Sequence, residues 1–272
     1  MTCVAVTWET VSPITVRRDW VGRLASYTGG VDTEKNLSHS QLAAEQSTTL
    51  DAERLAPGPG ARLLFLVMDL VYGQAGSLEK FRVLEVVARV PYIAWEQVAY
   101  VAITHTHSSP RFARDIHAEV TAIRAQQDNE FFHLLILEEL LQKRGIRLGF
   151  WKHRAIPQVL AWSYYHLSWL LYVLRPRLSY LLNAQFEDHA EHEYMSFVAE
   201  HPELDAETWS SSFEADYGSF ESVSDMLRRI ALDERHHKLE SLDRIKGARF
   251  GSTASAAEAT RGQATPEPST TS

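Results

Sequence analysis

The sequence predicts an all-α protein, folded as a bundle of about six helices. Apolar residues recur at intervals of three and four between Ala61 and about Lys246, which is the period of amphipathic helices. No segment that alternates apolar and polar residues is long enough to form a strand. The chain has 272 residues, 45% hydrophobic and 23% charged, which is typical of a globular protein with a sizeable core.

The first two expected helices lie on either side of a glycine-containing turn. An apolar segment from Arg62 to Tyr72 ends at Gly73, and Ser77 is placed to begin the next helix. Whether that second helix continues past Pro91 to about Val101 is open, because a proline inside a helix usually kinks or ends it.

Four further helices are expected, separated by recognisable helix breakers. Their ranges are 111–143, 156–174, 176–199 and 222–247. Gly145 is expected to stop the first of them, and Pro176 separates the second from the third. Ser222 or Ser224 is expected to cap the last helix.

The two ends of the chain lack this periodicity. Residues 1–60 are predicted to form an irregular N-terminal extension, and residues 61–246 to form the folded domain. Residues 251–272 are rich in Ser, Thr, Ala, Glu and Pro and are predicted to be a disordered tail. The start of the chain shows no basic patch followed by an apolar run, so we expect no secretory signal.

Charge and cysteine content exclude two classes of function. The net charge is −8, so the chain has no electrostatic footprint for a nucleic-acid partner. Cys3 is the single cysteine, which rules out a thiolate metal cluster, whereas twelve histidines are present. If a metal is bound, its ligands are therefore expected to be imidazole and carboxylate groups.

A pattern of glutamates and histidines fits such a metal site. Glu130 and His133 form one Glu-x-x-His pair, and Glu234 and His237 form a second. Residues three apart share one face of a helix, so each pair can present both groups to one point. Single glutamates on two other expected helices complete a set: one Glu from each of two helices, and Glu-x-x-His from each of the other two. The single glutamates are Glu85 and Glu187. This is the pattern of di-iron and di-manganese carboxylate bundles.

Plainer interpretations of the same residues remain open at this point. Glu130 and His133 can be a pair on a helix surface, and Glu85 can form an ion pair with Arg89 one helical turn later. His236 and His237 can simply be solvated.

Five segments, in the same order along the chain, resemble the alternative oxidase family. The plastid terminal oxidase branch, the plastoquinol oxidases, is the closer match. The resemblance extends from about Leu78 to Leu242. The segments are 84–92 (LEVVARVPY), 129–140 (NEFFHLLILEEL), 172–180 (YVLRPRLSY), 187–194 (EDHAEHEY) and 233–237 (DERHH).

The resemblance implies a ferritin-like di-iron four-helix bundle with additional short membrane-facing helices. It assigns six ligands to two Fe ions: Glu85, Glu130, His133, Glu187, Glu234 and His237. Tyr194 matches a tyrosine beside the iron centre that takes part in the redox chemistry, and Asn129 and Asp233 match residues that orient the ligands. Lys80, Leu84 and His189 match positions near the quinol pocket.

The chain also departs from the family pattern. Lys80 stands where the family usually has an arginine, which preserves the charge but loses the bidentate fork. His192 and Glu193 differ from the plastid pattern, and the stretch from Tyr194 to Glu234 looks shorter than in plastid enzymes. These departures leave the choice between ubiquinol and plastoquinol open.

The segment Ile156 to Leu174 is nearly long enough to cross a bilayer, but its pattern favours a helix that lies in the membrane surface. Gln158 and His166 interrupt it, and basic residues flank both of its ends. A buried core helix is the alternative. The segment Arg62 to Tyr72 is expected to be either a second membrane-facing helix or a core helix.

The resemblance therefore implies a quinol oxidase, peripheral or monotopic on a cytoplasmic or thylakoid membrane. Its partners are quinol, O₂, the membrane surface and, by analogy with the family, a second copy in a homodimer. It is expected to reduce O₂ to water without pumping protons. The alternatives are a di-iron hydroxylase of quinone biosynthesis and a non-enzymatic helical protein whose glutamates only form ion pairs.

Overall fold

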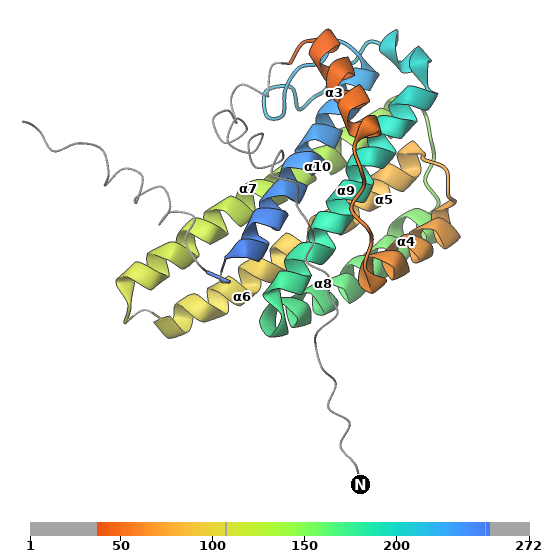
Figure 1. Cartoon of the computed structure of the whole chain (residues 1–272). Coiled ribbons are helices and arrows are strands. Elements are labelled where there is room, and N and C mark those ends of the chain that lie inside the picture. Colours follow the sequence, from red (N-terminus) through yellow and green to blue (C-terminus); the bar gives the residue numbers. More distant parts are fainter. Residues whose placement is uncertain (1–36, 107, 248, 251–272) are drawn as a thin grey trace, which may run out of the picture. The chain divides into compact units, whose positions relative to one another are not determined.

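The computed structural model describes residues 37–106, 108–247 and 249–250, and these are helical with short connections (Figure 1). Contacts divide the chain into units Met1–Ser38 and His39–Ser272, and every helix described below belongs to the second. The α-helices are α3 (His39–Asp51), α4 (Pro59–Tyr72), α5 (Leu78–Ala88), α6 (Val90–Thr106), α7 (Pro110–Lys143), α8 (Ile156–Leu174), α9 (Pro176–Glu200) and α10 (Val223–Lys246). A π-helical turn, η1 (Trp151–Ala155), precedes α8, and a 3-10 turn, η2 (Pro202–Asp205), follows α9.

The predicted all-α bundle is confirmed for the described ranges, where the only extended pairing is an isolated bridge between Thr208 and Ser222. Helices α5, α7, α9 and α10 form the four-helix core, with α9 and α10 packed along each other in the middle of Figure 1. Both α9 and α10 bury residues around most of their circumference, as expected of helices at the centre of a bundle.

The predicted helix boundaries are set by the expected local chemistry. The Ser77 side chain accepts a hydrogen bond from the Lys80 backbone N–H at the start of α5, and Ser222 does the same for Asp225 at the start of α10. Helix α7 stops at Gly145, whose φ of +66° is a conformation that favours glycine.

The question about Pro91 is answered by two separate helices. Helix α5 ends at Ala88, and α6 begins at Val90, with Arg89 between them. Pro91 therefore lies in the first turn of a new helix, where its missing N–H needs no partner. The second of these helices runs to Thr106, beyond the predicted limit near Val101.

The prediction that residues 1–60 are irregular is wrong for residues 39–51, which form α3. This helix is held on α9 and α10 by polar anchors: Gln46 donates to the Met195 carbonyl at 2.8 Å and accepts from Arg228 at 2.9 Å. With few apolar residues on its buried face, α3 produces no hydrophobic period in the sequence. Residues 1–36 and 251–272 lie outside the described residues, so the predictions for them stay predictions.

Among the helices described, none is both long enough and apolar enough to cross a membrane.

Candidate metal centre

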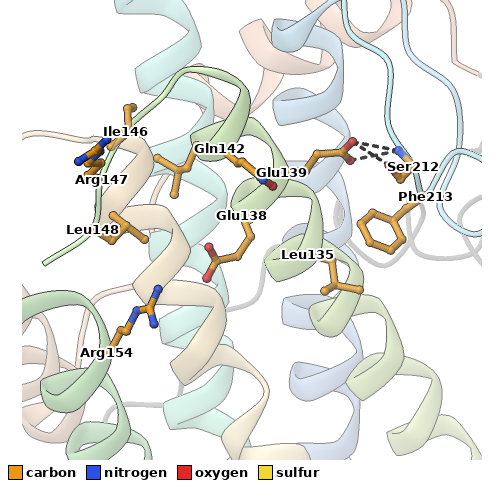
Figure 2. A pocket seen from close by; sticks show the side chains of 11 residues that line it. Leu135, Glu138, Glu139, Gln142, Ile146, Arg147, Leu148, Arg154, Ser212 and Phe213 are labelled. Atoms are coloured by element: carbon orange, nitrogen blue, oxygen red, sulfur yellow. Dashed lines mark hydrogen bonds between the residues drawn. The ribbon is translucent and has the colours of Figure 1, made fainter. Parts of the chain in front are cut away.

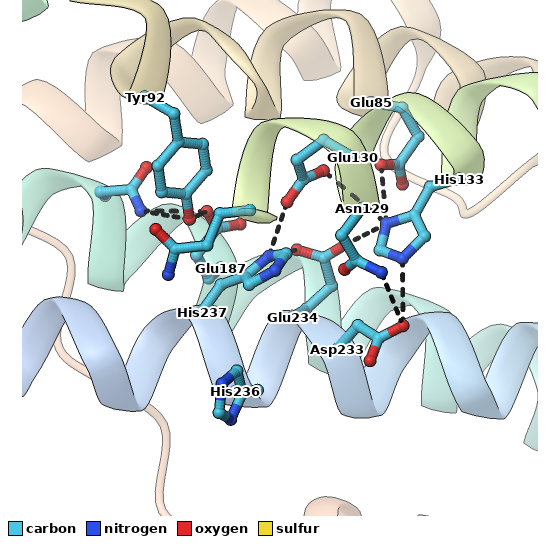
Figure 3. A network of polar contacts seen from close by, with 12 residues as sticks. Glu85, Tyr92, Asn129, Glu130, His133, Glu187, Asp233, Glu234, His236 and His237 are labelled. Carbon is cyan, nitrogen blue, oxygen red and sulfur yellow. Dashed lines mark hydrogen bonds and ion pairs between the residues drawn. The ribbon is translucent and has the colours of Figure 1, made fainter. Parts of the chain in front are cut away.

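The four core helices each direct acidic or imidazole side chains to one place inside the bundle (Figure 3). Glu85 comes from α5 and Glu187 from α9. Because residues three apart lie on one helix face, α7 contributes a carboxylate and an imidazole together, and α10 contributes a second such pair. All six predicted ligands are buried, and none is more than 3% exposed: Glu85, Glu130, His133, Glu187, Glu234 and His237.

These six side chains form two groups that overlap. Glu85 and His133 meet Glu130 and Glu234 in one group whose ligand atoms all lie within 4.8 Å of one another. Glu187 and His237 meet the same Glu130 and Glu234 in the second group. Two carboxylates are therefore shared, and each group has one further carboxylate and one imidazole. The two groups could therefore hold two cations, with Glu130 and Glu234 within reach of both.

The closest approaches within the cluster join imidazole nitrogens to carboxylate oxygens. His133 Nδ1 lies 3.1 Å from Glu234 Oε1 and 3.3 Å from Glu85 Oε2. His237 Nδ1 lies 2.6 Å from Glu130 Oε1. Both imidazoles thus turn Nδ1 toward the shared carboxylates, which is the orientation that a metal ligand needs.

The residues present fit a pair of metal ions by a test of their buried polar atoms. Eight of these atoms lack a partner in hydrogen-bond geometry: Glu85 Oε2, both carboxylate oxygens of Glu130 and of Glu234, Glu187 Oε2, and Nδ1 of His133 and of His237. Buried polar atoms are nearly always paired, so a concentration of orphans at one point indicates a missing partner. Carboxylate and imidazole donors together suit iron or manganese.

The electrostatics of the cluster also call for cations. Burial, reinforced by the neighbouring Glu234, raises the pKa of Glu85 and of Glu187 well above the usual range. Burial, with Glu130, also raises the pKa of Glu234. Although burial opposes ionisation of Glu130 too, His237 and His133 lower its pKa to about 2. Four carboxylates this close cannot all ionise at low cost unless positive charge lies between them.

Asp233, next to the ligand Glu234, orients one of the imidazoles. Its Oδ2 accepts from His133 Nε2 at 3.3 Å, from Asn129 Nδ2 at 3.3 Å and from the Tyr217 hydroxyl at 2.7 Å. Arg229 donates to its other oxygen at 2.5 Å. With Nε2–H held by Asp233, the His133 ring keeps Nδ1 free to face the cluster. The predicted pair Asn129 and Asp233 is thus brought together beside the site.

Two tyrosines donate to glutamates at opposite ends of the cluster. The Tyr194 hydroxyl donates to Glu85 Oε1, and the Tyr92 hydroxyl donates to Glu187 Oε1 at 2.7 Å. Asn183 also donates to Glu187 Oε1, at 3.0 Å. Sequence reasoning singled out Tyr194 and missed Tyr92 and Tyr217. A signal for Tyr92 was available, because it is the last residue of the segment 84–92 that resembles the family.

The predicted quinol residues lie near the Tyr194 end of the cluster. Two of them, Lys80 and His189, contact side chains of α4. Lys80 is 1% exposed; its Nζ donates to Asp69 Oδ1 at 2.9 Å and lies 3.8 Å from Glu193 Oε2. His189, one turn before Glu193 on α9, stacks on Phe65 of α4 with ring centroids 4.1 Å apart. Leu84 is fully buried on α5. Lys80 is therefore a partner in a buried ion pair and not a free ammonium group.

The interpretation of the predicted ligands as surface, solvated or ion-paired side chains is wrong. Of the residues considered there, only His236 is a partly exposed side chain outside the cluster. Glu85 faces the cluster, while the Arg89 guanidinium lies over the Phe131 ring, 5.3 Å from its centroid. His236 is partly exposed on another side of α10 from Glu234 and pairs with Glu240 at 2.9 Å (Figure 3).

A third acidic cluster, Asp188 with Glu191 and His192, is already neutralised by basic side chains. Lys238 Nζ lies 3.0 Å from Asp188 Oδ1 and 2.5 Å from Glu191 Oε2. Arg235 contacts Glu191 as well, at 2.8 Å. These buried ion pairs tie α9 to α10, and the carboxylates have no charge left to offer a metal.

A cavity of about 720 Å³ lies at the C-terminal end of α7 (Figure 2). Its walls include Leu135, Glu138 and Arg154, together with Glu139, which accepts hydrogen bonds from Ser212. None of the six predicted ligands lines it, so this cavity is separate from the candidate metal centre.

Comparison with known proteins agrees with this geometry. The family model described as alternative oxidase matches residues 33–241, which is more than half of the chain. Alternative oxidases are di-iron enzymes with a helical bundle. The chain is also 29% identical over 166 residues to ubiquinol oxidase 4, chloroplastic/chromoplastic, of Arabidopsis thaliana. That match covers 61% of this chain and 44% of the relative, so the chain spans less than half of the relative's length. The expected resemblance to the plastid branch is confirmed by this match.

Proposed function

This chain belongs to the alternative oxidase family, and from that membership we propose that it is a di-iron quinol oxidase that reduces O₂ to water. One observation carries the proposal: the two groups of four buried ligands share Glu130 and Glu234. Glu130 and Glu234 would be available to both metal ions, and a pair of metal ions at one site can act on one substrate molecule.

Each residue of the cluster has a defined part in holding the metals. Glu85 and His133 would be the unshared ligands of one iron, and Glu187 and His237 those of the other. A bound iron pair supplies the binding of O₂ and the stepwise transfer of electrons to it. Asp233 keeps His133 in the tautomer that ligates through Nδ1.

Tyr194 is proposed to deliver hydrogen equivalents at the Glu85 end. Burial, and then the charge of Glu85, raises the pKa of Tyr194 well above 10, so its hydroxyl keeps its proton at neutral pH. The hydrogen bond to Glu85 Oε1 gives that proton an acceptor at the moment an electron leaves the ring. Quinol then restores the hydrogen atom to the phenoxyl oxygen of Tyr194.

The quinol is proposed to bind between α4, α5 and α9, where Lys80, Leu84 and His189 lie. Burial, followed by the charge of Arg54, lowers the pKa of His189 to about 4, so its imidazole is neutral and can exchange hydrogen bonds with a quinol hydroxyl. Lys80 fixes Asp69 and Glu193 in place beside it. The ring of a quinol is apolar, and the partly exposed Phe65, which stacks on His189, provides apolar surface for it.

Helices α4 and α8 are proposed to face the membrane from which the quinol enters. On α4, Leu63, Leu66 and Leu70 are each more than 60% exposed. On α8, Val159 and Trp162 are exposed to a similar degree. The Tyr72 hydroxyl donates to the Lys152 carbonyl at 2.8 Å, which ties the end of α4 to the turn before α8. Exposed apolar faces beside basic residues are typical of helices that lie in the membrane surface.

The homodimer expected from the family is proposed to form through α6 and α7. These two packed helices expose large apolar side chains, namely Tyr100 and Val101 on α6 and Phe131 on α7. A second copy of the chain would cover this surface. By analogy with the family, the oxidation is further proposed to proceed without proton pumping.

Oxygen uptake by the iron-loaded protein in lipid or detergent tests the function, with ubiquinol and plastoquinol supplied in turn. We expect quinol-dependent uptake that disappears in Glu130→Ala and persists in His236→Ala, whose histidine faces away from the cluster. The assignment fails if Glu130→Ala retains wild-type uptake. Labelled O₂ decides against a hydroxylase if all of the label enters water and none enters an organic product.

A further inference from the structure

An unbroken series of oxidisable rings leads away from the Glu187 end of the metal centre. Tyr92, which donates to Glu187, packs edge-on against Trp95 with ring centroids 5.2 Å apart. Trp95 contacts Tyr180 at 4.8 Å and Tyr172 at 5.7 Å, and the last two rings lie 5.5 Å apart. All four side chains are at most 2% exposed and belong to one buried cluster.

Each ring in this series has a hydrogen-bond partner for its polar atom. Trp95 Nε1 donates to Ser179 Oγ at 2.9 Å. The hydroxyls of Tyr172 and Tyr180 lie 3.0 Å apart, and both lie within hydrogen-bond distance of the Arg249 carbonyl, at 3.3 and 3.4 Å. Arg249 and its neighbour Phe250 are partly exposed, so the series ends one residue layer below the solvent.

Core packing alone does not require these residue types. Phenylalanine fills a core as well as tyrosine does, without a hydroxyl that must find a partner on burial. Here three successive positions outward from Tyr92 bear rings that can lose an electron. The tyrosine at the other end of the centre shows the contrast, because Tyr194 packs on Phe81 at 4.3 Å and Phe81 packs on Phe197 at 5.1 Å. Phenylalanine does not lose electrons readily, so Phe81 and Phe197 do not extend a series of oxidisable rings outward from Tyr194.

We propose that Tyr92, Trp95, Tyr180 and Tyr172 form a redox relay that drains oxidising equivalents from the metal centre when quinol is not available. The inference rests on the proposed function, because the oxidant is the centre after it has reacted with O₂. The relay would spare the ligands from oxidation at the expense of an electron donor in solution.

The electrons and protons balance along the relay. Tyr92 gives one electron to the oxidised centre, and its O–H bond breaks as the proton passes to Glu187 Oε1. Trp95 returns an electron to Tyr92, which takes its proton back. Tyr180 or Tyr172 then reduces the Trp95 radical cation and loses its phenolic proton to solvent water beside the partly exposed Arg249, whose carbonyl both hydroxyls approach. A one-electron donor in solution, of the thiol or ascorbate class, supplies the final electron and proton.

The test uses the full-length iron-loaded protein, reduced and then mixed with O₂ in the absence of quinol. Radicals are measured by rapid-freeze electron paramagnetic resonance, and oxidised side chains by peptide mass spectrometry. We expect wild type to show a radical and oxidative marks on Tyr172 and Tyr180, and both to be absent when ascorbate is present from the start of the reaction. In Trp95→Phe these marks are expected to fall several-fold, while marks on Tyr92 rise. Trp169→Phe, at a partly exposed tryptophan of α8 outside the series, is the matched control and is expected to behave as wild type.

A second variant guards against a folding defect in the first. The double change Tyr172→Phe with Tyr180→Phe keeps both rings and removes both hydroxyls, and it is expected to leave the radical on Trp95 or Tyr92. Equal marks on Tyr172 and Tyr180 in wild type and Trp95→Phe would overturn the relay while leaving the quinol oxidase assignment intact. If the iron-loaded wild type does not consume O₂ at all, the proposed function fails, and the relay fails with it.

Discussion

The two ends of the metal centre begin alike and continue differently. At each end a buried tyrosine hydroxyl donates to an unshared glutamate, Tyr194 to Glu85 and Tyr92 to Glu187. Beyond Tyr194 lie phenylalanines and the buried ion pair of Lys80, whereas beyond Tyr92 lie a tryptophan and two further tyrosines. A hydrogen bond from a tyrosine to a glutamate is therefore proposed to take part in quinol oxidation at the Tyr194 end and in the redox relay at the Tyr92 end. The neighbouring rings make the difference.

The largest difference between the two ends is expected from removing each hydroxyl. Tyr194→Phe deletes the donor nearest the proposed quinol site, and we expect quinol-dependent oxygen uptake to fall about 10²-fold, the usual scale for a lost proton-transfer group. Tyr92→Phe is expected to keep most of this uptake but to lose the radical on Tyr172 and Tyr180. Initial rates with excess quinol measure the first effect. Equal losses in the two variants would remove the distinction between the ends.

The next effect concerns the residue that orients His133. Asp233→Asn keeps the size of the side chain but weakens its hold on His133 Nε2 and on Arg229. We expect iron affinity to fall about 10- to 100-fold mainly at the Glu85 end, since the Asp233 side chain orients His133 and contacts neither Glu187 nor His237. Anaerobic iron titration should then resolve two unequal sites. Two sites weakened to the same extent would contradict the separate support of the two ends.

A smaller effect is expected at the proposed quinol site. Lys80→Met removes the cation between Asp69 and Glu193, leaving their carboxylates to repel each other. We expect KM for quinol to rise about tenfold, or ~1.4 kcal/mol, with kcat changed less. Lys80→Arg, which keeps the positive charge and introduces the arginine usual in the family, serves as the matched control. A fall in kcat with KM unchanged would place Lys80 outside the quinol site.

The smallest expected effect is a dependence of the metal-free protein's stability on pH. Burial, with Glu234, raises the pKa of Glu85 and Glu187, and carboxylate neighbours raise the pKa of His237 despite its burial. The folded metal-free protein therefore holds more protons than the unfolded chain above about pH 5, so its stability falls as pH rises toward 8. Iron replaces those protons and should flatten the curve. Thermal unfolding with and without iron measures this, and a metal-free Tm that rises over that range would contradict it.

Sequence periodicity was sufficient to predict the helices whose apolar residues recur at helical spacing. Long apolar stripes predicted the core helices, and the i, i+3 spacing of Glu130 with His133 predicted their convergence. Helix α3 escaped prediction because polar contacts such as that of Gln46 hold it in place. The sharing of Glu130 and Glu234 also could not be foreseen, because it depends on how four helices pack in space.

The partners of individual side chains were the least predictable features. Lys80 was expected beside the quinol, and nothing in its sequence neighbourhood indicates the buried pair with Asp69 of another helix. Tyr92 lies in the segment 84–92 that resembles the family, but nothing in the sequence indicates its hydrogen-bond partner Glu187 on another helix. Only the packing of Trp95, Tyr172 and Tyr180 against it reveals a continuous series of rings.

The central claim is that two irons share Glu130 and Glu234. Mössbauer spectroscopy of the anaerobically iron-loaded and then oxidised protein tests it most directly, with a Glu130→Gln and Glu234→Gln double variant as the comparison. We expect a magnetically coupled iron pair in wild type and no coupled pair in the double variant. A single uncoupled iron in wild type, or an unchanged coupled pair in the double variant, would contradict it.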